Sequence, residues 1–92
     1  MITLSKKIII PVKLAQYENQ KLITRSEAKQ LLTRITQFET VILDFSGVDF
    51  IGQAFADEIF RVFARKNPGI KISAIHTSVE VQQMIRRALS RE

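Results

Sequence analysis

The chain has 92 residues, with 14 lysines and arginines, 9 aspartates and glutamates, no cysteine and a formal net charge of +5. This length allows one domain and not two, and the hydrophobic share of 46% is that of an ordinary globular protein, which excludes disordered and fibrous classes. Without cysteine there are no disulfides or thiolate metal sites, and the absence of a charged and apolar leader or a long apolar run predicts a cytoplasmic protein without a membrane span.

The basic residues are spread along the chain rather than gathered in one arm. Residues 1–46 carry 7 basic and 4 acidic side chains, and residues 47–92 carry 7 and 5. Nucleic-acid-binding proteins usually concentrate lysines and arginines on one face or tail, and the local cluster here consists of Arg86, Arg87 and Arg91. A triplet of this kind is usually a solvated helix face, so charge alone does not predict a nucleic-acid partner.

The first predicted element is extended and lies at the edge of a sheet. Residues 2–5 alternate apolar and polar side chains, and residues 7–12 are rich in β-branched side chains, so the first strand could be split in two. Pro11 cannot donate a backbone hydrogen bond, which predicts an edge strand or a bulge. Such an edge could pair with a second copy of the chain, although Lys6, Lys7 and Pro11 would oppose uncontrolled pairing.

The first helix begins with a capping signal. Residues 13–23 have no sustained periodicity and predict a loop. Thr24 then precedes Glu27 by three residues, which predicts a reciprocal capping box at a helix N-terminus. The apolar residues that follow are spaced by three and four positions and predict one buried stripe, made of Ala28, Leu31, Leu32, Ile35 and Phe38.

Residues 41–60 predict a strand, a tight loop and a helix without a gap. Residues 41–45 are a nearly continuous apolar run, which predicts a central strand with both faces covered. The helix should extend from about residue 52 to residue 66, where the Asn67-Pro68-Gly69 sequence ends it. Its inward side chains should be Ala56, Ile59, Phe60 and Phe63, and its outward side chains Asp57, Glu58, Arg61 and Arg65.

One more strand and one more helix complete the pattern. Residues 70–75 predict a strand, and Thr77 with Glu80 offers a second capping box before the last helix. Alternating strands and helices are typical of α/β proteins, whose parallel strands are joined by right-handed crossovers. The predicted fold class is therefore α/β, in a single domain over residues 1–92. The expected apolar set of the last helix is Val81, Met84, Ile85, Ala88 and Leu89.

Two blocks of the sequence resemble a known family. Residues 43–51 (Leu-Asp-Phe-Ser-Gly-Val-Asp-Phe-Ile) and residues 55–60 (Phe-Ala-Asp-Glu-Ile-Phe) resemble the bacterial STAS-like family of uncharacterised function, and residues 24–28 resemble its Arg-Ser-Glu stretch. The resemblance implies a small STAS-like sheet of about four strands, mixed and with parallel neighbours, packed against three helices. More distantly, the pattern is similar to the STAS domains of anti-sigma-factor antagonists and sulfate transporters.

The loop before the second helix differs from that of true STAS domains. In anti-sigma-factor antagonists this loop ends in Asp-Ser-Ser-Gly, and a serine of the motif is phosphorylated by a partner kinase. The matching positions here are residues 52–55, Gly-Gln-Ala-Phe. A helix start with free amides would suit a phosphoserine, but neither Gln53 nor Ala54 has a hydroxyl group. The resemblance therefore implies a docking surface without this switch.

We expect a non-enzymatic protein-interaction or regulatory module that docks a partner through this loop and the start of the second helix. The candidates for the partner are a kinase-like ATPase and a second copy of the chain. Asp44 should bind loop amides, and Gly47 should supply backbone freedom to the loop. The residues expected to contact the partner are Ser46, Gly52, Gln53, Asp57 and Arg61.

The sequence favours neither an enzyme nor a cofactor-binding protein. Asp44, Asp49, Asp57 and Glu58 are scattered, which predicts solvated or capping acids rather than a metal site. His76 is the only histidine, and no orienting acid is predicted beside it for a serine nucleophile. The loop has neither a dinucleotide fingerprint nor a Walker-type lysine, so we expect no cofactor.

The alternative interpretation is a small basic nucleic-acid-associated protein that binds through Arg86, Arg87 and Arg91 of the last helix. The modest basic balance of the chain argues for it. Affinity that is dominated by phosphate contacts falls steeply with salt, so a salt titration separates the two hypotheses.

Overall fold

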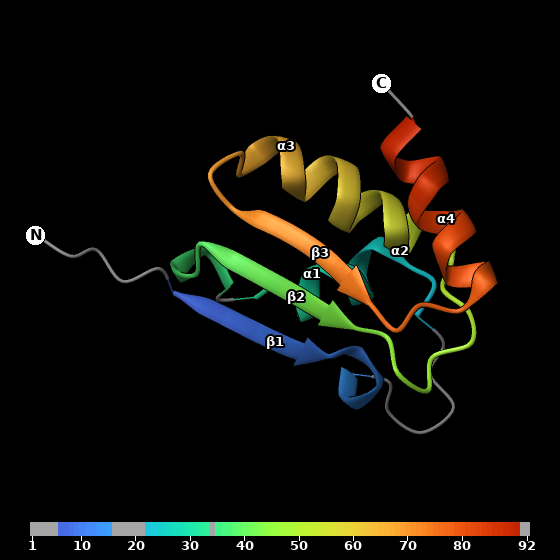
Figure 1. Ribbon diagram of the computed structural model, residues 1–92. Coiled ribbons are helices and arrows are strands. Elements are labelled where there is room, and N and C mark those ends of the chain that lie inside the picture. Colours follow the sequence, from blue (N-terminus) through green and yellow to red (C-terminus); the bar gives the residue numbers. More distant parts are fainter. Residues whose placement is uncertain (1–5, 16–21, 34, 91–92) are drawn as a thin grey trace, which may run out of the picture.

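The sheet is small and parallel. A computed structural model describes residues 6–15, 22–33 and 35–90. Within these residues, strands β1 (Lys7–Pro11), β2 (Thr40–Asp44) and β3 (Lys71–Ile75) form one sheet in the order β1-β2-β3, with both neighbouring pairs parallel (Figure 1). The expectation of about four strands in a mixed sheet is not confirmed. The extended segment expected at residues 2–5 lies outside the described residues.

The helices lie on one face of the sheet, as Figure 1 shows, so the described part of the molecule has two layers. No helix in these residues is both long and apolar enough to cross a membrane. In chain order the helical elements are turn η1 (Val12–Ala15), α1 (Arg25–Leu31), turn η2 (Ile35–Gln37), α2 (Gln53–Asp57), the π-helical segment η3 (Glu58–Phe63), α3 (Ala64–Lys66) and α4 (Val79–Ser90).

Strand β2 is central, as predicted, but helices cover only one of its faces. The side chains of Val41 and Leu43 are completely buried and belong to the hydrophobic core that the sheet shares with the helices. Ile42, between them, points to the other face of the sheet and is only half-buried. Its neighbour in β1 is Ile9, which is exposed. The prediction that both faces are covered is therefore wrong for the described residues, because an apolar run does not distinguish an open face from a covered one.

Strand β1 is an edge strand of the described sheet, in agreement with the prediction from Pro11. The capping box of α1 is also confirmed, since the amide of Glu27 donates to Thr24 Oγ1 and the amide of Thr24 donates to Glu27 Oε1. The apolar stripe continues past the end of α1 at Leu31. Its core-facing residues Ala28, Leu32 and Ile35 are buried.

The second helix has the predicted extent, but its buried surface is much wider than one stripe. Residues 55–60 are buried without interruption, including the acids Asp57 and Glu58. The prediction that these two acids point outward is wrong. Helices α1 and α4 both pack against α2 and η3, so side chains on the flanks of this helix are covered as well.

Helix α4 begins one residue later than its predicted capping box requires. Ser78 caps the helix, because its hydroxyl accepts the amide of Val81 over 3.1 Å. Thr77 instead donates its hydroxyl to Gln82 Oε1, so the box with Glu80 does not form. The apolar face is as predicted for Val81, Ile85 and Ala88, which are buried, and for Met84, which packs against the core. Leu89 departs from the prediction, because it is exposed on the last turn.

Candidate functional site

The candidate site lies where the three parallel strands end. In Figure 1 the arrowheads of the strands point to one end of the molecule, where turn η1, the loop at residues 45–52 and the start of α4 gather. Lys13 Nζ donates a hydrogen bond to the Gly47 carbonyl over 3.3 Å, and the Ser78 hydroxyl donates to the Asp49 carbonyl over 2.9 Å. The loop after β2 is therefore tied to the segments that follow both neighbouring strands.

An acid, a hydroxyl and an imidazole meet at the centre of this end. Asp44 is the last residue of β2 and His76 follows β3, so the parallel register brings them together. Ser46 donates its amide and its hydroxyl to Asp44 Oδ1 over 2.9 and 2.7 Å. His76 Nδ1 lies 2.9 Å from the same oxygen. The side-chain hydrogen bonds from Ser46 and then from His76 lower the pKa of Asp44 to about 2.

This cluster is not arranged as a nucleophilic triad. A triad places the acid and the serine on opposite nitrogens of the imidazole, whereas Asp44 and Ser46 both contact Nδ1 of His76, at 2.9 and 3.0 Å. The expectation that no acid lies beside His76 is wrong, because the parallel pairing of β2 and β3 brings Asp44 next to the residue that follows β3. Asp44 accepts a hydrogen bond from the Ser46 amide, which is a contact of the kind expected of it in the loop.

The backbone around this cluster contains two residues in the left-handed region. Gly47 has a φ of 77°, a conformation that glycine adopts readily because it has no Cβ. His76 has a φ of 56°, a conformation that histidine adopts more readily than most other residues with a side chain. The turns after β2 and β3 therefore bend sharply at the point where their side chains meet.

The start of α2 is closed by another part of the chain. The amide of Gly52 donates to the Leu22 carbonyl over 2.8 Å, and the amide of Phe55 donates to the Ile23 carbonyl over 3.0 Å. The expectation that free amides could bind an anion is therefore wrong for these two groups, because the carbonyls of the segment before α1 already accept their hydrogen bonds. Gly52 is buried in this contact, whereas Gln53 is exposed.

Gly52 is required for close approach rather than for an unusual conformation. Its φ is −77°, which any residue can adopt. A Cβ at this position would lie 2.7 Å from the Cα of Ile23 and 2.8 Å from its carbonyl oxygen. The absence of a side chain at Gly52 thus allows the segment before α1 to lie directly on the start of α2.

Asp57 is the centre of a buried ionic network and does not reach the surface. Its side chain is 0% exposed, and Arg25 Nη1 and Arg61 Nη2 lie 2.8 and 2.7 Å from its Oδ2. Arg61 Nε is 2.5 Å from Oδ1, and Arg25 also lies 3.6 Å from the buried Glu58. The hydrogen bonds from Arg61 and then Arg25 outweigh burial and hold the pKa of Asp57 well below its ordinary range. The network therefore connects α1 to the second helix, and its acid cannot itself contact a partner.

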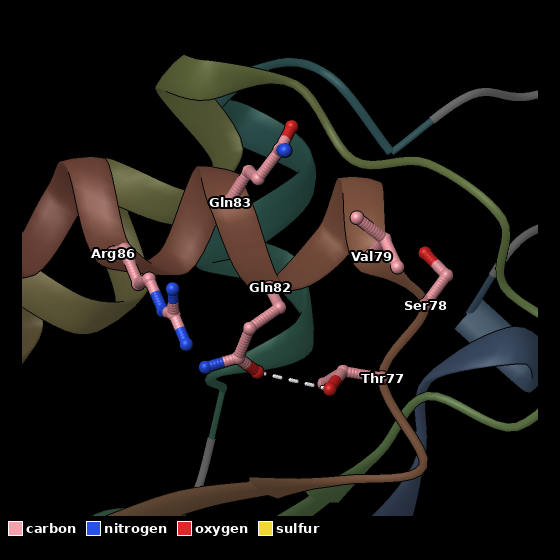
Figure 2. Close-up of a pocket in the computed structure, with 6 residues that line it drawn as sticks. All are labelled: Thr77, Ser78, Val79, Gln82, Gln83 and Arg86. Carbon is pink, nitrogen blue, oxygen red and sulfur yellow. Dashed lines mark hydrogen bonds between the residues drawn. The ribbon is translucent and has the colours of Figure 1, made fainter.

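A hollow of about 410 Å³ lies beside the start of α4. Figure 2 shows two rows of side chains along one outer face of the helix, with Gln82 and Arg86 in one row and Val79 and Gln83 in the other. Residues spaced by three, four and seven positions share one helix face, which explains this grouping. The complete lining is Thr77, Ser78, Val79, Gln82, Gln83 and Arg86.

Several exposed apolar residues belong to the segments that meet at the strand ends. Asp49 and Ser78 are joined by a hydrogen bond, and the residue after each of them is apolar and exposed. Phe50, which follows Asp49, is 49% exposed, and Val79, which follows Ser78, is 70% exposed. Leu14 follows Lys13 in the same way, and Ile23 lies against Gly52. Sequence reasoning missed this group because its members are far apart in the chain and resemble core residues in composition. We call the four residues Leu14, Ile23, Phe50 and Val79 the apolar rim.

The predicted partner-contacting residues differ in accessibility. Ser46 and Gln53 are exposed and Arg61 is half-buried, whereas Gly52 and Asp57 are buried. The structure joins Arg61 to Asp57 and places Ser46 in the separate cluster with Asp44. Direct contact with a partner is therefore open to Ser46, Gln53 and Arg61.

The arginines of the alternative interpretation lie on α4. Arg86 and Arg87 are exposed, and Arg91 lies outside the residues that the structure describes. In the described ranges, no group of three or more histidines, aspartates or glutamates is placed to hold a metal ion.

These features define a small two-layer α/β domain with a structured loop and an apolar rim at the carboxyl end of its parallel sheet. Residues 27–82 match the family described as a STAS-like domain of unknown function (DUF4325). The match covers more than half of the 92 residues, so the chain belongs to this family. The comparisons with curated proteins and with solved structures found no match.

Proposed function

We propose that this chain is a non-enzymatic regulatory module that docks a protein partner at the carboxyl end of its sheet. The partner would contact the loop after β2, the start of α2 and the apolar rim. The observation that carries this proposal is the rim itself, because four exposed large apolar residues belong to four separate segments that meet at one end of a small domain. Exposed apolar patches of this kind on a small domain mark protein-interaction sites.

The hydrogen bonds beneath the rim support docking by a preformed surface. Phe50 and Val79 are held near each other by the bond between Asp49 and Ser78, and Ile23 is fixed by its backbone contact with α2. A surface that is already ordered loses little conformational entropy when a partner binds. Binding would therefore require little rearrangement of this chain.

The polar residues divide between contact and support. Ser46 and Gln53 are exposed beside the rim and can form hydrogen bonds with a partner. Gly52 and Asp57 lie beneath the surface and hold the segments on which it is built. Because neither Gln53 nor Ala54 has a hydroxyl group, phosphorylation at these positions would not regulate the docking.

The family resemblance and the open edge of β1 suggest different partners. A kinase-like ATPase is the partner that the resemblance implies, and it would bind at the apolar rim. A second copy of the chain could instead pair along β1, where Pro11 and Lys7 limit strand addition. Sedimentation of the purified chain at two concentrations distinguishes the second case, since self-pairing increases with concentration.

The test compares an apolar residue inside the rim with one outside it. Phe50→Ser should reduce the capture of a partner from a lysate of the source organism by at least about fivefold, because a central aromatic contact carries much of the energy of an interface. Ile9→Ser is the matched control, since Ile9 is also an exposed large apolar residue but lies on the sheet face. Quantitative mass spectrometry of the captured proteins gives the readout.

The captured protein is then purified and its affinity is measured against each variant. Equal affinities for the unsubstituted chain, Phe50→Ser and Ile9→Ser would contradict docking at the rim. Thermal unfolding of both variants should match that of the unsubstituted chain, because each substitution is made at an exposed side chain.

A further inference from the structure

The hollow beside α4 presents hydrogen-bond donors without an acid that faces them. Arg86 is exposed on the helix, and no acidic side chain of the described residues forms an ion pair with it. Gln82 lies one helical turn before Arg86 on the same row of the hollow (Figure 2). A cation and an amide thus border the same open space.

The amide of Gln82 is oriented by a hydrogen bond. The hydroxyl of Thr77 donates to Gln82 Oε1 over 2.9 Å, so the carbonyl end of this amide is occupied. Its NH2 group is consequently turned away from Thr77, and Figure 2 shows it on the side of the Arg86 guanidinium. Two donors that border one space favour a ligand that only accepts hydrogen bonds, and a carboxylate is such a group.

Two backbone amides of the first turn of α4 are already bonded within the helix. The hydroxyl of Ser78 accepts a hydrogen bond from the backbone amide of Val81. The backbone amide of Gln82 donates to the Ser78 carbonyl over 2.9 Å. The side chains of Gln82 and Arg86 line the hollow and can be changed without removing the cap that Ser78 provides.

The opposite row of the hollow is apolar at its first position. Val79 is 70% exposed and belongs to the apolar rim, while Gln83 follows it one turn later. A ligand that fills the hollow would place an apolar group on Val79 and an acidic group beside Arg86. The hollow is thus continuous with the docking surface.

We propose that the hollow binds a glutamate or aspartate side chain in an acidic, partly apolar segment of the protein partner. This inference rests on the proposed docking function and names the chemistry of the partner. The net charge of +5 of the chain favours an acidic partner in general. A nucleic-acid backbone fits less well, because Arg86 is the one basic residue of the lining and phosphate recognition normally uses several.

A peptide probe tests the chemistry directly. The full-length chain, labelled with nitrogen-15, is titrated with a short capped peptide of alternating glutamate and leucine and, separately, with the same peptide carrying glutamine for glutamate. The glutamate peptide should shift the NMR signals of residues 77–86 and bind at least about tenfold more tightly than the glutamine peptide, as expected for a charge-assisted contact.

Two neighbouring arginines provide a matched pair of variants. Arg86→Gln should weaken binding of the glutamate peptide about tenfold, whereas Arg87→Gln should change it less than about twofold, since Arg87 does not line the hollow. Equal losses in the two variants, an absence of shifts at residues 77–86, or tighter binding of a thymidine oligonucleotide to those residues would overturn the inference.

The outcome can be separated from that of the docking proposal. One outcome is that Phe50→Ser abolishes capture of the partner while Arg86→Gln captures as much of it as the unsubstituted chain. This outcome would support docking at the apolar rim and reject the proposed role of the hollow. Loss of capture in both variants, together with the preference for the glutamate peptide, supports both.

Discussion

At the scale of single residues, Gly52 gives the sharpest stability prediction. Gly52→Ala should lower the free energy of unfolding by about 1–3 kcal/mol, because its Cβ would collide with backbone atoms of Ile23 that cannot move independently. Gly69→Ala is the control, since nothing lies within 4 Å of a Cβ at that position. This control should be neutral or stabilising by up to about 1 kcal/mol. Urea denaturation of both variants provides the measurement, and equal losses would contradict the contact.

Asp44 should make the folded chain sensitive to acid in a defined range. Its pKa is lowered to about 2 in the fold, chiefly by the Ser46 hydroxyl and then by His76. Because the pKa of Asp44 is lower in the folded chain than in the unfolded chain, the ionised carboxylate stabilises the fold. This stabilisation is complete above the unfolded pKa of about 4 and is lost as the pH falls toward 2. Ser46→Ala should therefore raise the pKa of Asp44 toward its ordinary value.

Carbon-13 NMR titration of the side-chain carboxyl group measures this pKa in the folded chain. Thr33→Ala removes a hydroxyl that donates only within α1 and its C-terminal turn, so it should leave the Asp44 midpoint unchanged. An Asp44 midpoint near 4 in the unsubstituted chain, or one that Ser46→Ala does not move, would contradict the hydrogen bonds of the cluster.

At the scale of elements, the network around Asp57 should stabilise the packing of α1 on the second helix. Arg61→Gln should lower the free energy of unfolding by about 2–4 kcal/mol, because a completely buried carboxylate loses its principal donor. Arg25→Gln should cost less, about 1 kcal/mol, since Arg25 is 45% exposed and provides the smaller share of the contacts.

Chemical denaturation ranks these variants against Lys66→Gln, an exposed basic residue at the end of the same helix. The control should change the free energy of unfolding by less than about 0.5 kcal/mol. A larger effect for Arg25→Gln than for Arg61→Gln would show that the network is held mainly from α1.

Local patterns determine which elements could be predicted. The capping box at Thr24 and the bounds of the second helix depend on neighbouring residues, and both were predictable. The π-helical segment η3 could not be predicted, because one wider turn leaves the apolar side chains at spacings that still suit an α-helix. The burial of Asp57 depends on Arg25, which is distant in the chain, so no local pattern could indicate it.

At the scale of the whole molecule, the distribution of charge predicts weak nucleic-acid binding. Between about 50 and 200 mM salt, the affinity for the protein partner should fall by less than about tenfold, since few charged contacts are involved. The nucleic-acid alternative would be supported by tight binding to unrelated DNA or RNA whose affinity falls steeply over this range. The double substitution Arg86→Gln and Arg87→Gln should then abolish that binding. Fluorescence anisotropy at several salt concentrations measures both.

The candidate site was predictable only in part. The meeting of Asp44 with His76 follows from a parallel sheet, because residues that end neighbouring parallel strands share one edge. The apolar rim could not be foreseen, since exposure of Phe50 and Val79 depends on how loops from different crossovers settle against one another. Gly52 was expected to contact a partner, whereas the close approach of Ile23 that buries it could be found only in the three-dimensional arrangement.

The parallel registers also determine the order in which the chain can fold during synthesis. Lys7 pairs with Thr40 and Thr40 with Lys71, so each pairing closes about thirty residues of chain and no described strand can form a hairpin with its neighbour. The first ladder must wait until β2 has left the ribosome, and the clustering of Asp44 with His76 must wait for β3. The proposed docking surface would then be the last part of the nascent chain to mature.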